Sequence, residues 1–455
     1  MSSNRFEISK YLHYIGDKNS RLYFHSLFGN LYLLERDYIL FLENFTGLAP
    51  TNDSDISVFH SLLDAGYIVD RSVDERQILA SKRDSFINSL SHWGQVYSLD
   101  LNISEACNFS CPHCMNGCSV QNKKHLLMTA ETARKAVDWF SLVLSSNGHS
   151  PQIHYGSAEP LLNYEVLKES IIYVRDKIPQ AEISINTNLS CLTEEMALFF
   201  KENHVFLASS LDGPKEVNDL VRVYKCGSSF DLILEKIHLL ERIGIPLDGI
   251  SITMNDLNIE RIDRGFILFL KSLGFTGLAT DIDLVGCANS SHDVSYYVNH
   301  MLEIYDNCME LGIENFGSWT KPFTNLVNQE DGCLMSYCRA QKGHNISVNP
   351  EGNMFLCGYS TSSICNLDDV DIETVPSGYL SLVTNKLPGN NPRCVGCFLE
   401  GSCAGQCLVT HEFSVKNKTE ERVIFLCDFF KRCFKGLMHR KLNREIGGAI
   451  TPLFV

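Results

Sequence analysis

The sequence predicts an α/β protein with a small module before a long βα series and a cysteine-rich segment after it. Strand-like and helix-like patterns alternate between about residues 95 and 290. The first 90 residues show a different order of elements, and most of the 18 cysteines lie in the second half of the chain in short-spaced clusters. Alternation of this kind is typical of a parallel sheet, open or partly closed as a barrel.

The N-terminal residues are expected to form a winged-helix-like module. Leu22–His25 and Leu31–Leu34 are short apolar or alternating runs with a turn-bearing stretch between them, which predicts a β-hairpin. Two helix-like segments and a short strand follow, and then a helical linker. The expected ranges of these four elements are Asp37–Asn44, Ser57–Ala65, Gly66–Val69 and Asp74–Ser91.

The middle of the chain supplies six expected strands and the helices between them. The strands are Tyr97–Ile103, Gln152–Tyr155, Glu182–Asn186, Val205–Ser209, Gly249–Met254 and Gly277–Leu284. The helices are Thr129–Ser145, Asn163–Lys177, Thr193–Asn203, Ser229–Ile243 and Asn258–Leu273. In parallel sheets of this kind, ligands bind at the carboxyl ends of the strands.

Length and composition restrict the class of protein. The 455 residues are enough for two or three domains. A net charge of −15 gives no electrostatic support for a nucleic-acid partner. There is no run of 18 apolar residues, so no membrane span is expected, and the polar N-terminus favours a cytoplasmic location. In a reducing compartment, clustered cysteines indicate metal or iron–sulfur binding rather than disulfides.

The first cysteine cluster follows the first strand of the βα series. Cys107, Cys111 and Cys114 have the spacing Cys-x3-Cys-x2-Cys. A [4Fe–4S] cubane held by three thiolates has one iron without a protein ligand, and an open coordination position distinguishes a catalytic metal site from a structural one.

This triplet resembles the signature of the radical SAM superfamily. The resemblance implies a partial (β/α)6, TIM-like barrel whose open iron binds S-adenosylmethionine through its amino and carboxylate groups. It also implies that one electron from the cluster cleaves the S–C5′ bond and yields a 5′-deoxyadenosyl radical.

Two further loops resemble cofactor-binding loops of the same superfamily. Gly156–Leu162 is similar to a Gly-Gly-Glu-Pro loop, with Ser157 and Ala158 at the glycine positions, and implies that Glu159 binds the cofactor's amino group. The alternative is that this carboxylate caps the next helix. Ile185–Asn188 resembles a Thr-Asn-Gly position and implies a cofactor contact from Asn188, or else an ordinary turn.

The next strand ends in a more specific motif. Ser209–Pro214 resembles the Ser-Leu-Asp-Gly-Pro stretch of peptide-modifying radical SAM enzymes related to sulfatase maturases. The resemblance implies that Ser210 and Arg222 contact the ribose or carboxylate of the cofactor, and arginine suits a carboxylate because it donates two parallel hydrogen bonds. The alternative for Arg222 is a structural ion pair with Asp212 or Asp219.

Two carboxylates near the end of the last predicted strand are candidate catalytic acids or bases. Asp281 and Asp283 occupy a position where a side chain can face the substrate. The alternative is that they cap a helix or loop.

The C-terminal cysteines resemble the SPASM domain, which carries two auxiliary [4Fe–4S] clusters in radical SAM enzymes. Cys357 belongs to a Gly-x4-Cys unit, and Cys333 adds an eighth thiolate to the seven of the motif. The resemblance implies two fully ligated, electron-transferring clusters, and the alternative is structural zinc. One cluster would use Cys333, Cys338, Cys357 and Cys407, and the other would use Cys394, Cys397, Cys403 and Cys427.

These resemblances imply a maturase of a ribosomally made peptide. The N-terminal module would bind the leader of the precursor peptide as an added strand, and flavodoxin or ferredoxin would supply electrons. Thioether formation, other cross-links and epimerisation all fit. The alternatives are an anaerobic sulfatase maturase that makes formylglycine and a zinc-stabilised protein without catalytic activity. The expected domains are 1–90, 91–325 and 326–435, with a tail over 436–455.

Overall fold

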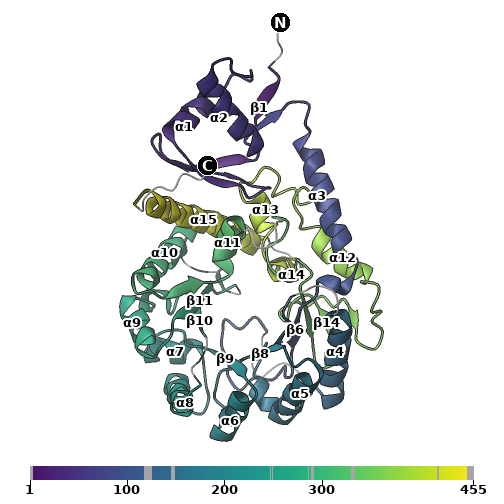
Figure 1. Ribbon diagram of the computed structural model, residues 1–455. Helices are drawn as coiled ribbons and strands as arrows, with labels where there is room; N and C mark the ends of the chain where they lie inside the picture. The colour runs from purple at the N-terminus through teal and green to yellow at the C-terminus, as the bar shows by residue number, and fades with distance from the viewer. Residues whose placement is uncertain are drawn as a thin grey trace.

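The structure is a computed structural model, and it places the N-terminal module and the βα series at opposite ends of the molecule. The C-terminal segments lie between them (Figure 1). The structure describes residues 4–116, 126–144, 149–245, 247, 249–284, 286–287, 290, 292–328, 334–417 and 420–447. None of the described helices combines the length and the apolar character that crossing a bilayer requires.

The N-terminal module contains two small antiparallel sheets. Strands β2, β3 and β4 form one sheet, and β1 pairs with β5 in the other. The predicted hairpin is confirmed, because β3 pairs antiparallel with β4. The sequence did not predict β1, which is only three residues long and too short to show a periodic pattern. The elements are β1 Phe6–Ile8, β2 Leu12–Gly16, β3 Arg21–His25, β4 Leu31–Leu34, α1 Arg36–Glu43, α2 Asp53–Asp64, β5 Ile68–Asp70 and α3 Glu75–Ser89.

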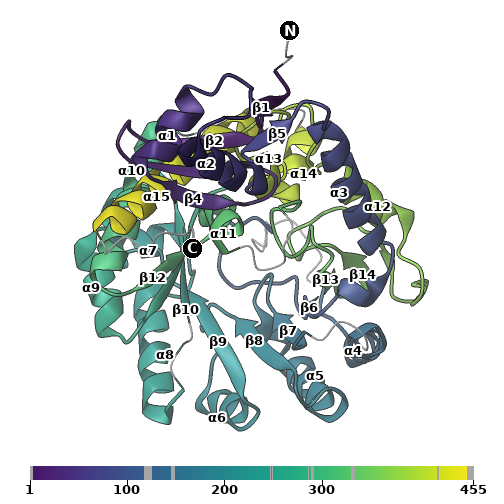
Figure 2. The ribbon, with the colours of Figure 1, turned by 45° about the horizontal axis from the view of Figure 1, so that its top comes forward.

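The middle of the chain forms the expected partial barrel. Its strands lie side by side in the order β12-β11-β10-β9-β8-β7-β6, each parallel to the next, with helices on the outer face (Figure 2). The strands are β6 Ser98–Leu101, β7 Gln152–Tyr155, β8 Glu182–Asn186, β9 Val205–Ser210, β10 Gly249–Met254, β11 Gly277–Ile282 and β12 Glu314–Phe316. The helices are η1 Trp93–Gln95, α4 Ala130–Val143, η3 Pro160–Asn163, α5 Tyr164–Lys177, α6 Glu194–Glu202, α7 Lys215–Val221, α8 Ser229–Ile243, η4 Ile259–Arg261, α9 Arg264–Ser272, α10 Val294–Glu310, η6 Ser318–Thr320 and α11 Lys321–Asn328.

Side-chain alternation along the strands produces a polar barrel interior. In β10, Ile250 is buried in the core, whereas its neighbours Ser251 and Thr253 line a cavity inside the barrel. Ser251 pairs in register with Ala279 of β11, and Thr253 pairs with Asp281. Because successive side chains of a strand point to opposite faces, the two strands present these four residues to the same cavity.

One predicted helix is interrupted. The segment Asn258–Leu273 divides into η4 and α9. Asp263 forms the N-cap of α9, where its Oδ1 accepts a hydrogen bond from Phe266 N at 2.9 Å. A side chain that satisfies the free N–H groups at a helix start favours a new helix at that position.

The C-terminal segment extends the barrel sheet. Strand β13 pairs parallel with β6, and β14 and β15 continue the sheet beyond it. Helix α15 crosses residue 435, where the sequence predicted that a tail begins, and packs against β2, β3 and α10. The elements are β13 Asn345–Val348, β14 Asn353–Phe355, β15 Cys365–Asn366, α12 Ser377–Thr384, α13 Glu400–Cys403, α14 Leu408–Asn417 and α15 Glu421–Gly447.

A glycine in α13 allows the N-terminal module and the C-terminal segment to pack closely. Gly401 N donates a hydrogen bond to Ser26 O at 3.1 Å, and a Cβ at residue 401 would lie 2.3 Å from Ser26 O and 2.6 Å from Leu334 O. We expect Gly401→Ala to lower the free energy of unfolding by about 1–3 kcal/mol, because two backbone oxygens would have to move. Urea unfolding would measure this loss. Gly249→Ala is the control, since nothing lies within 4 Å of its Cβ position, and equal losses in both variants would contradict the prediction.

Candidate active site

The first cysteine cluster lies on a loop that is held on both sides. Glu159 N donates to Ala106 O at 3.0 Å, and Ser110 N donates to Val223 O at 2.8 Å. These bonds attach the loop to the segments that follow β7 and α7. They hold the part of the loop that carries Cys107 in place.

Six of the predicted cysteine ligands line one cavity, and four others line a second cavity. The larger cavity has a volume of about 720 Å³ and is lined by Cys107, Cys111, Cys114, Cys338, Cys357 and Cys407. The smaller one has a volume of about 260 Å³ and is lined by Cys394, Cys397, Cys403 and Cys427. The structure thus groups the C-terminal cysteines in the two predicted sets, except that Cys333 lies outside the described residues.

The cysteines surround cavities rather than a single point. Within the described part of the chain, no three His, Cys, Asp or Glu side chains are close enough to hold one metal ion. Burial raises the pKa of Cys107 to about 11 and that of Cys111 to about 12. Without a metal these thiols are therefore protonated at neutral pH, and metal binding has to release their protons.

Glu159 is a buried carboxylate that organises two neighbouring loops. Its Oε1 accepts hydrogen bonds from Leu161 N at 3.0 Å and Thr187 Oγ1 at 2.7 Å, and its Oε2 accepts one from Asn188 N at 2.7 Å. It caps η3, as the alternative interpretation expected, and it does not line the larger cavity. In the structure, Glu159 positions the Asn188 backbone, and its contact with a cofactor stays a prediction.

The titration of Glu159 predicts a pH dependence of stability. Burial raises its pKa from the ordinary 4.5 to about 7, against the opposing effect of its three hydrogen bonds. Between these values the folded chain keeps a proton that the unfolded chain has lost, so stability falls as pH rises through this window. We expect the wild type to lose more free energy of unfolding than Glu159→Gln between about pH 5 and about pH 8. Urea unfolding of both proteins across this pH range would measure the two profiles. Parallel profiles would contradict the prediction.

Three predicted cofactor contacts line the larger cavity. Asn188, Ser210 and Arg222 all contribute to its wall. Asn188 Nδ2 donates to Asn108 Oδ1 at 2.9 Å and lies 3.7 Å from Cys107 Sγ. A donor aimed at a thiolate sulfur is one means by which proteins tune iron–sulfur clusters.

Arg222 is both a cavity residue and one half of a buried ion pair. Its Nη2 donates to Asp212 Oδ1 at 3.2 Å, and its Nε lies 2.8 Å from Asp212 Oδ2, at ion-pair distance without hydrogen-bond alignment. Asp212 also accepts a hydrogen bond from Thr253 N at 2.7 Å, and its Oδ2 lies 3.4 Å from His113 Nε2. The structural alternative for Arg222 is therefore observed, and its role toward a cofactor stays a prediction.

The two candidate catalytic carboxylates occupy different environments. Asp281 lines the larger cavity, where its Oδ1 accepts hydrogen bonds from the backbone N–H and the hydroxyl of Ser318. Burial raises the pKa of Asp281. Asp283 is buried outside the cavity wall, and its Oδ1 accepts a hydrogen bond from Gly286 N at 2.9 Å. The geometry favours Asp281 of the two as a group that can face a substrate.

Several cavity residues were not singled out in the sequence. His113 lies within the first cysteine motif, and Tyr359 follows Cys357 by two residues, so their spacing from the cysteines was an available signal. Tyr359 lines the cavity, and 43% of its surface is exposed. Burial of its hydroxyl raises the pKa of this residue. Lys321, at the start of α11, has no comparable sequence signal.

Comparison with known proteins identifies the barrel. Residues 101–264 match the family model described as the radical SAM superfamily. The chain contains a radical SAM domain. Its cofactors are a [4Fe–4S] cluster and S-adenosylmethionine, and the three half-buried thiols that line the larger cavity fit the cluster. Together these cofactors supply an organic radical strong enough to remove hydrogen from an unreactive carbon.

Relatives and a solved structure cover most of the chain. Radical SAM cyclopropyl synthase TigE of Paramaledivibacter caminithermalis is 21% identical over 97% of this chain and 98% of its own length. A serine-type anaerobic sulfatase-maturating enzyme of Bacteroides thetaiotaomicron is 29% identical over 75% of this chain and 89% of its own. The structure of Streptococcus suis SuiB bound to its precursor peptide SuiA matches with a TM-score of 0.53 and 14% identity, covering 91% of this chain and 98% of SuiB. The likeness to SuiB shows a shared fold.

These comparisons bear on two earlier expectations. The expected enzyme class and the partial barrel are confirmed. The zinc-stabilised, non-catalytic alternative loses its support, because relatives with enzyme names match along most of the chain.

Proposed function

We propose that this enzyme modifies a ribosomally made precursor peptide by removing hydrogen from one of its residues, giving a cross-link such as a thioether, or an epimerised residue where a thiol returns a hydrogen atom to the opposite face of the carbon. The observation that carries the proposal is the larger cavity, which is lined both by the triplet Cys107, Cys111 and Cys114 and by three cysteines of the C-terminal set. A substrate in this cavity would lie between the radical source and a second cluster. That cluster would accept the surplus electron when a cross-link forms.

The chain's own residues would position the substrate and handle its protons. Asp281, fixed by its hydrogen bonds to Ser318, is the proposed acid or base of the cavity. The four-cysteine set around the smaller cavity would bind the second auxiliary cluster, and a flavodoxin or ferredoxin would serve as electron donor. A reducing compartment such as the cytoplasm suits these thiols.

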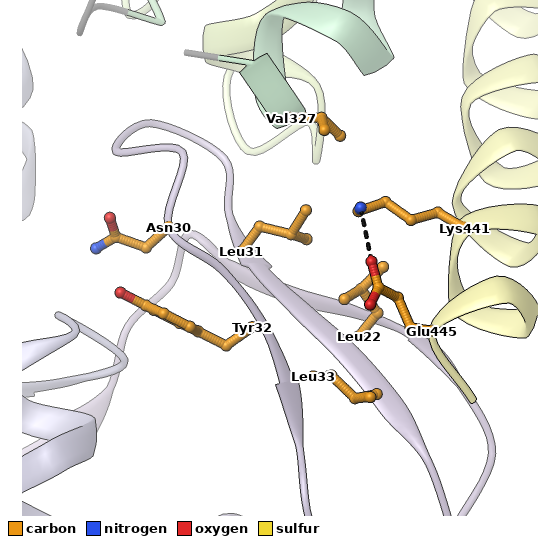
Figure 3. A pocket seen from close by; sticks show the side chains of 8 residues that line it. All are labelled: Leu22, Asn30, Leu31, Tyr32, Leu33, Val327, Lys441 and Glu445. Carbon is orange, nitrogen blue, oxygen red and sulfur yellow. Dashed lines mark hydrogen bonds and ion pairs between the residues drawn. The ribbon is translucent and has the colours of Figure 1, made fainter. Parts of the chain in front are cut away.

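The leader of the precursor would bind along β4. Strand β4 is an edge strand of its sheet, and a cavity of about 310 Å³ runs beside it, lined by Leu22, Leu31 and Leu33 on the sheet and by Lys441 of α15 on the other side. Figure 3 shows Leu31 and Leu33 pointing toward α15, where Lys441 pairs with Glu445 at 3.0 Å. Edge strands with unpaired backbone groups bind peptides as an added strand, and SuiB provides a structural precedent for a precursor-bound relative.

The backbone hydrogen bonds of the hairpin identify the donors available to a leader. His25 N donates to Asn30 O, and pairing along β3 and β4 alternates from that point, so the N–H groups of Leu31 and Leu33 face the free edge. We expect Leu33→Pro to weaken binding of a labelled leader peptide by about tenfold or more, because it removes one edge donor without breaking a bond to β3. Fluorescence anisotropy would measure the affinity.

The matched control for this variant is Leu33→Ala. It shortens the side chain but keeps the N–H group, so it separates loss of packing from loss of a backbone donor. Equal affinities of Leu33→Pro and the wild type would contradict binding along this edge.

Anaerobic turnover with a candidate precursor, a short peptide encoded near the gene, tests the proposed function. The enzyme would be incubated with S-adenosylmethionine and dithionite, and the peptide would be analysed by mass spectrometry. Loss of two hydrogen atoms indicates a cross-link. A mass that is unchanged in ordinary water but rises by one deuterium in heavy water indicates epimerisation. An unmodified peptide, in a reaction that does produce 5′-deoxyadenosine, would contradict the proposal.

The second candidate is a sulfatase maturase that oxidises serine or cysteine to formylglycine. The observation in its favour is the 29% identity to the Bacteroides thetaiotaomicron enzyme. A sulfatase-derived peptide in the same assay distinguishes the two candidates, because formylglycine carries an aldehyde that a hydrazide reagent captures, whereas a cross-link or an epimer does not react.

A further inference from the structure

The larger cavity is lined by two cationic residues, Arg222 and Lys321. Arg222 is paired with Asp212, as described above. Lys321, the first residue of α11, contributes its side chain to the same cavity. Its Nζ lies 5.3 Å from the centre of the Tyr337 ring.

Lys321 is an unpaired cation within the described part of the chain. No carboxylate of a described residue forms an ion pair with it, and its ammonium group lies over the face of Tyr337. Asp281 lines the same cavity, and its Oδ1 accepts hydrogen bonds from both donors of Ser318. The positive charge of Lys321 acts through space on Asp281 and on the Cys407 thiol, where it opposes the rise in pKa that burial causes, but Lys321 forms no ion pair with Asp281.

The side chains around Lys321 leave its ammonium group available to a ligand in the cavity. The Tyr337 ring supports the ammonium group from one side, and the Tyr337 hydroxyl is itself fixed by donating to Ser318 O at 2.7 Å. The neighbouring hydroxyl of Thr324 donates to Lys321 O. An ammonium group placed on an aromatic face beside a cavity keeps its remaining donors for an anion.

We propose that Lys321 binds a carboxylate of the substrate and thereby selects which residue reaches the radical source. The proposal rests on the proposed function, because a peptide offers two such groups, an acidic side chain and the C-terminal carboxylate. Arg222 is already neutralised by Asp212, so among the described residues that line the cavity Lys321 provides the positive charge that no carboxylate pairs.

Matched pairs of short peptides test this proposal. Reconstituted enzyme with S-adenosylmethionine and no reductant would be titrated calorimetrically, so that binding is measured without turnover. One pair is acetyl-Ala-Glu-Ala amide and acetyl-Ala-Gln-Ala amide. The other is acetyl-Ala-Ala-Ala with a free carboxylate and the same peptide as its amide. In at least one pair the wild type should bind the charged member about tenfold more tightly, and the pair concerned identifies the source of the carboxylate.

Three variants assign the preference to Lys321. Lys321→Met should abolish the preference, Lys321→Arg should retain it, and Lys18→Met, which changes an exposed lysine of the N-terminal module, should leave it intact. Iron content and circular dichroism would confirm that each variant is loaded and folded. Equal binding of charged and neutral peptides by the wild type, or an unchanged preference in Lys321→Met, would overturn the proposal.

One further outcome separates Lys321 from the cofactor. If Lys321→Met weakened binding of S-adenosylmethionine and the peptide pairs showed no preference, Lys321 would belong to the cofactor site and the proposal would be wrong. Failure of the Lys321 proposal in any of these ways leaves the proposed peptide modification untouched, because that proposal is judged by the mass of the precursor after turnover.

Discussion

Replacing Cys107, Cys111 and Cys114 together with alanine is expected to abolish formation of 5′-deoxyadenosine. All three residues line the larger cavity, and each is predicted to contribute one thiolate to the cluster that binds S-adenosylmethionine. Changes to residues that merely support metal ligands cost about 10–100-fold, so loss of all three ligands should exceed about 10³-fold. Chromatography of anaerobic reactions with dithionite would measure the product.

The same variant should keep its auxiliary clusters. If two fully ligated clusters remain, iron content should fall by about 4 of about 12 atoms per chain, and the protein should stay brown. Cys191→Ala is the matched control, because this thiol lies beside the loop, 3.7 Å from Asn108 Nδ2, but does not line the cavity. Undiminished 5′-deoxyadenosine formation by the triple variant would overturn the assignment of the first cluster.

The sequence predicted the barrel well because its strands alternate strictly. The expected ranges of β7, β8 and β10 agree with the structure residue for residue, and each is bounded by a helix with clear capping residues. The position of β13 was not predictable in the same way. Its four residues, Asn345–Val348, alternate polar and apolar but are too few to stand out in a cysteine-rich segment, and its partner β6 lies more than 240 positions earlier in the chain.

Two residues in the predicted cofactor loops differ from the motifs that those loops resemble, although the backbone conformation is the one a glycine would allow. Ser157 and Leu189 stand where related loops have glycine, yet both adopt left-handed backbone conformations, with φ of 84° and 63°. The surroundings hold them there, because Asn116 Nδ2 donates to Ser157 Oγ and Leu189 N donates to Thr187 Oγ1. The loop shape expected for glycine thus persists without glycine, at a cost of about 1–3 kcal/mol for each residue.

The substrate end of the cavity could be predicted least. Lys321 and Tyr337 come from α11 and from a loop before β13, and only the closed fold brings them beside Asp281. The cysteine sets were predictable because their chemistry needs several residues of one kind at regular spacing. A substrate contact needs one suitable side chain, which leaves no pattern in the sequence.

Arg222→Met is expected to produce the largest loss of stability among single substitutions in the site. The pair formed by Arg222 and Asp212 is buried, with 11% and 0% of the side chains exposed. Removing one partner leaves an uncompensated charge in the interior and should lower the free energy of unfolding by about 3–5 kcal/mol. Because Asp212 also accepts from Thr253 N, the loss should extend to the end of β10. Urea unfolding would measure it.

A double variant separates the structural role of Arg222 from its predicted role toward the cofactor. Arg222→Met combined with Asp212→Asn removes both charges and keeps an acceptor for Thr253 N, so most of the lost stability should return. Binding of S-adenosylmethionine to the folded, iron-loaded double variant then reports on the guanidinium alone. Weakened binding would show that Arg222 contacts the cofactor in addition to its ion pair with Asp212. Unchanged binding would leave Arg222 with the structural role only, because a residue needed solely for the ion pair becomes dispensable when its partner is neutral.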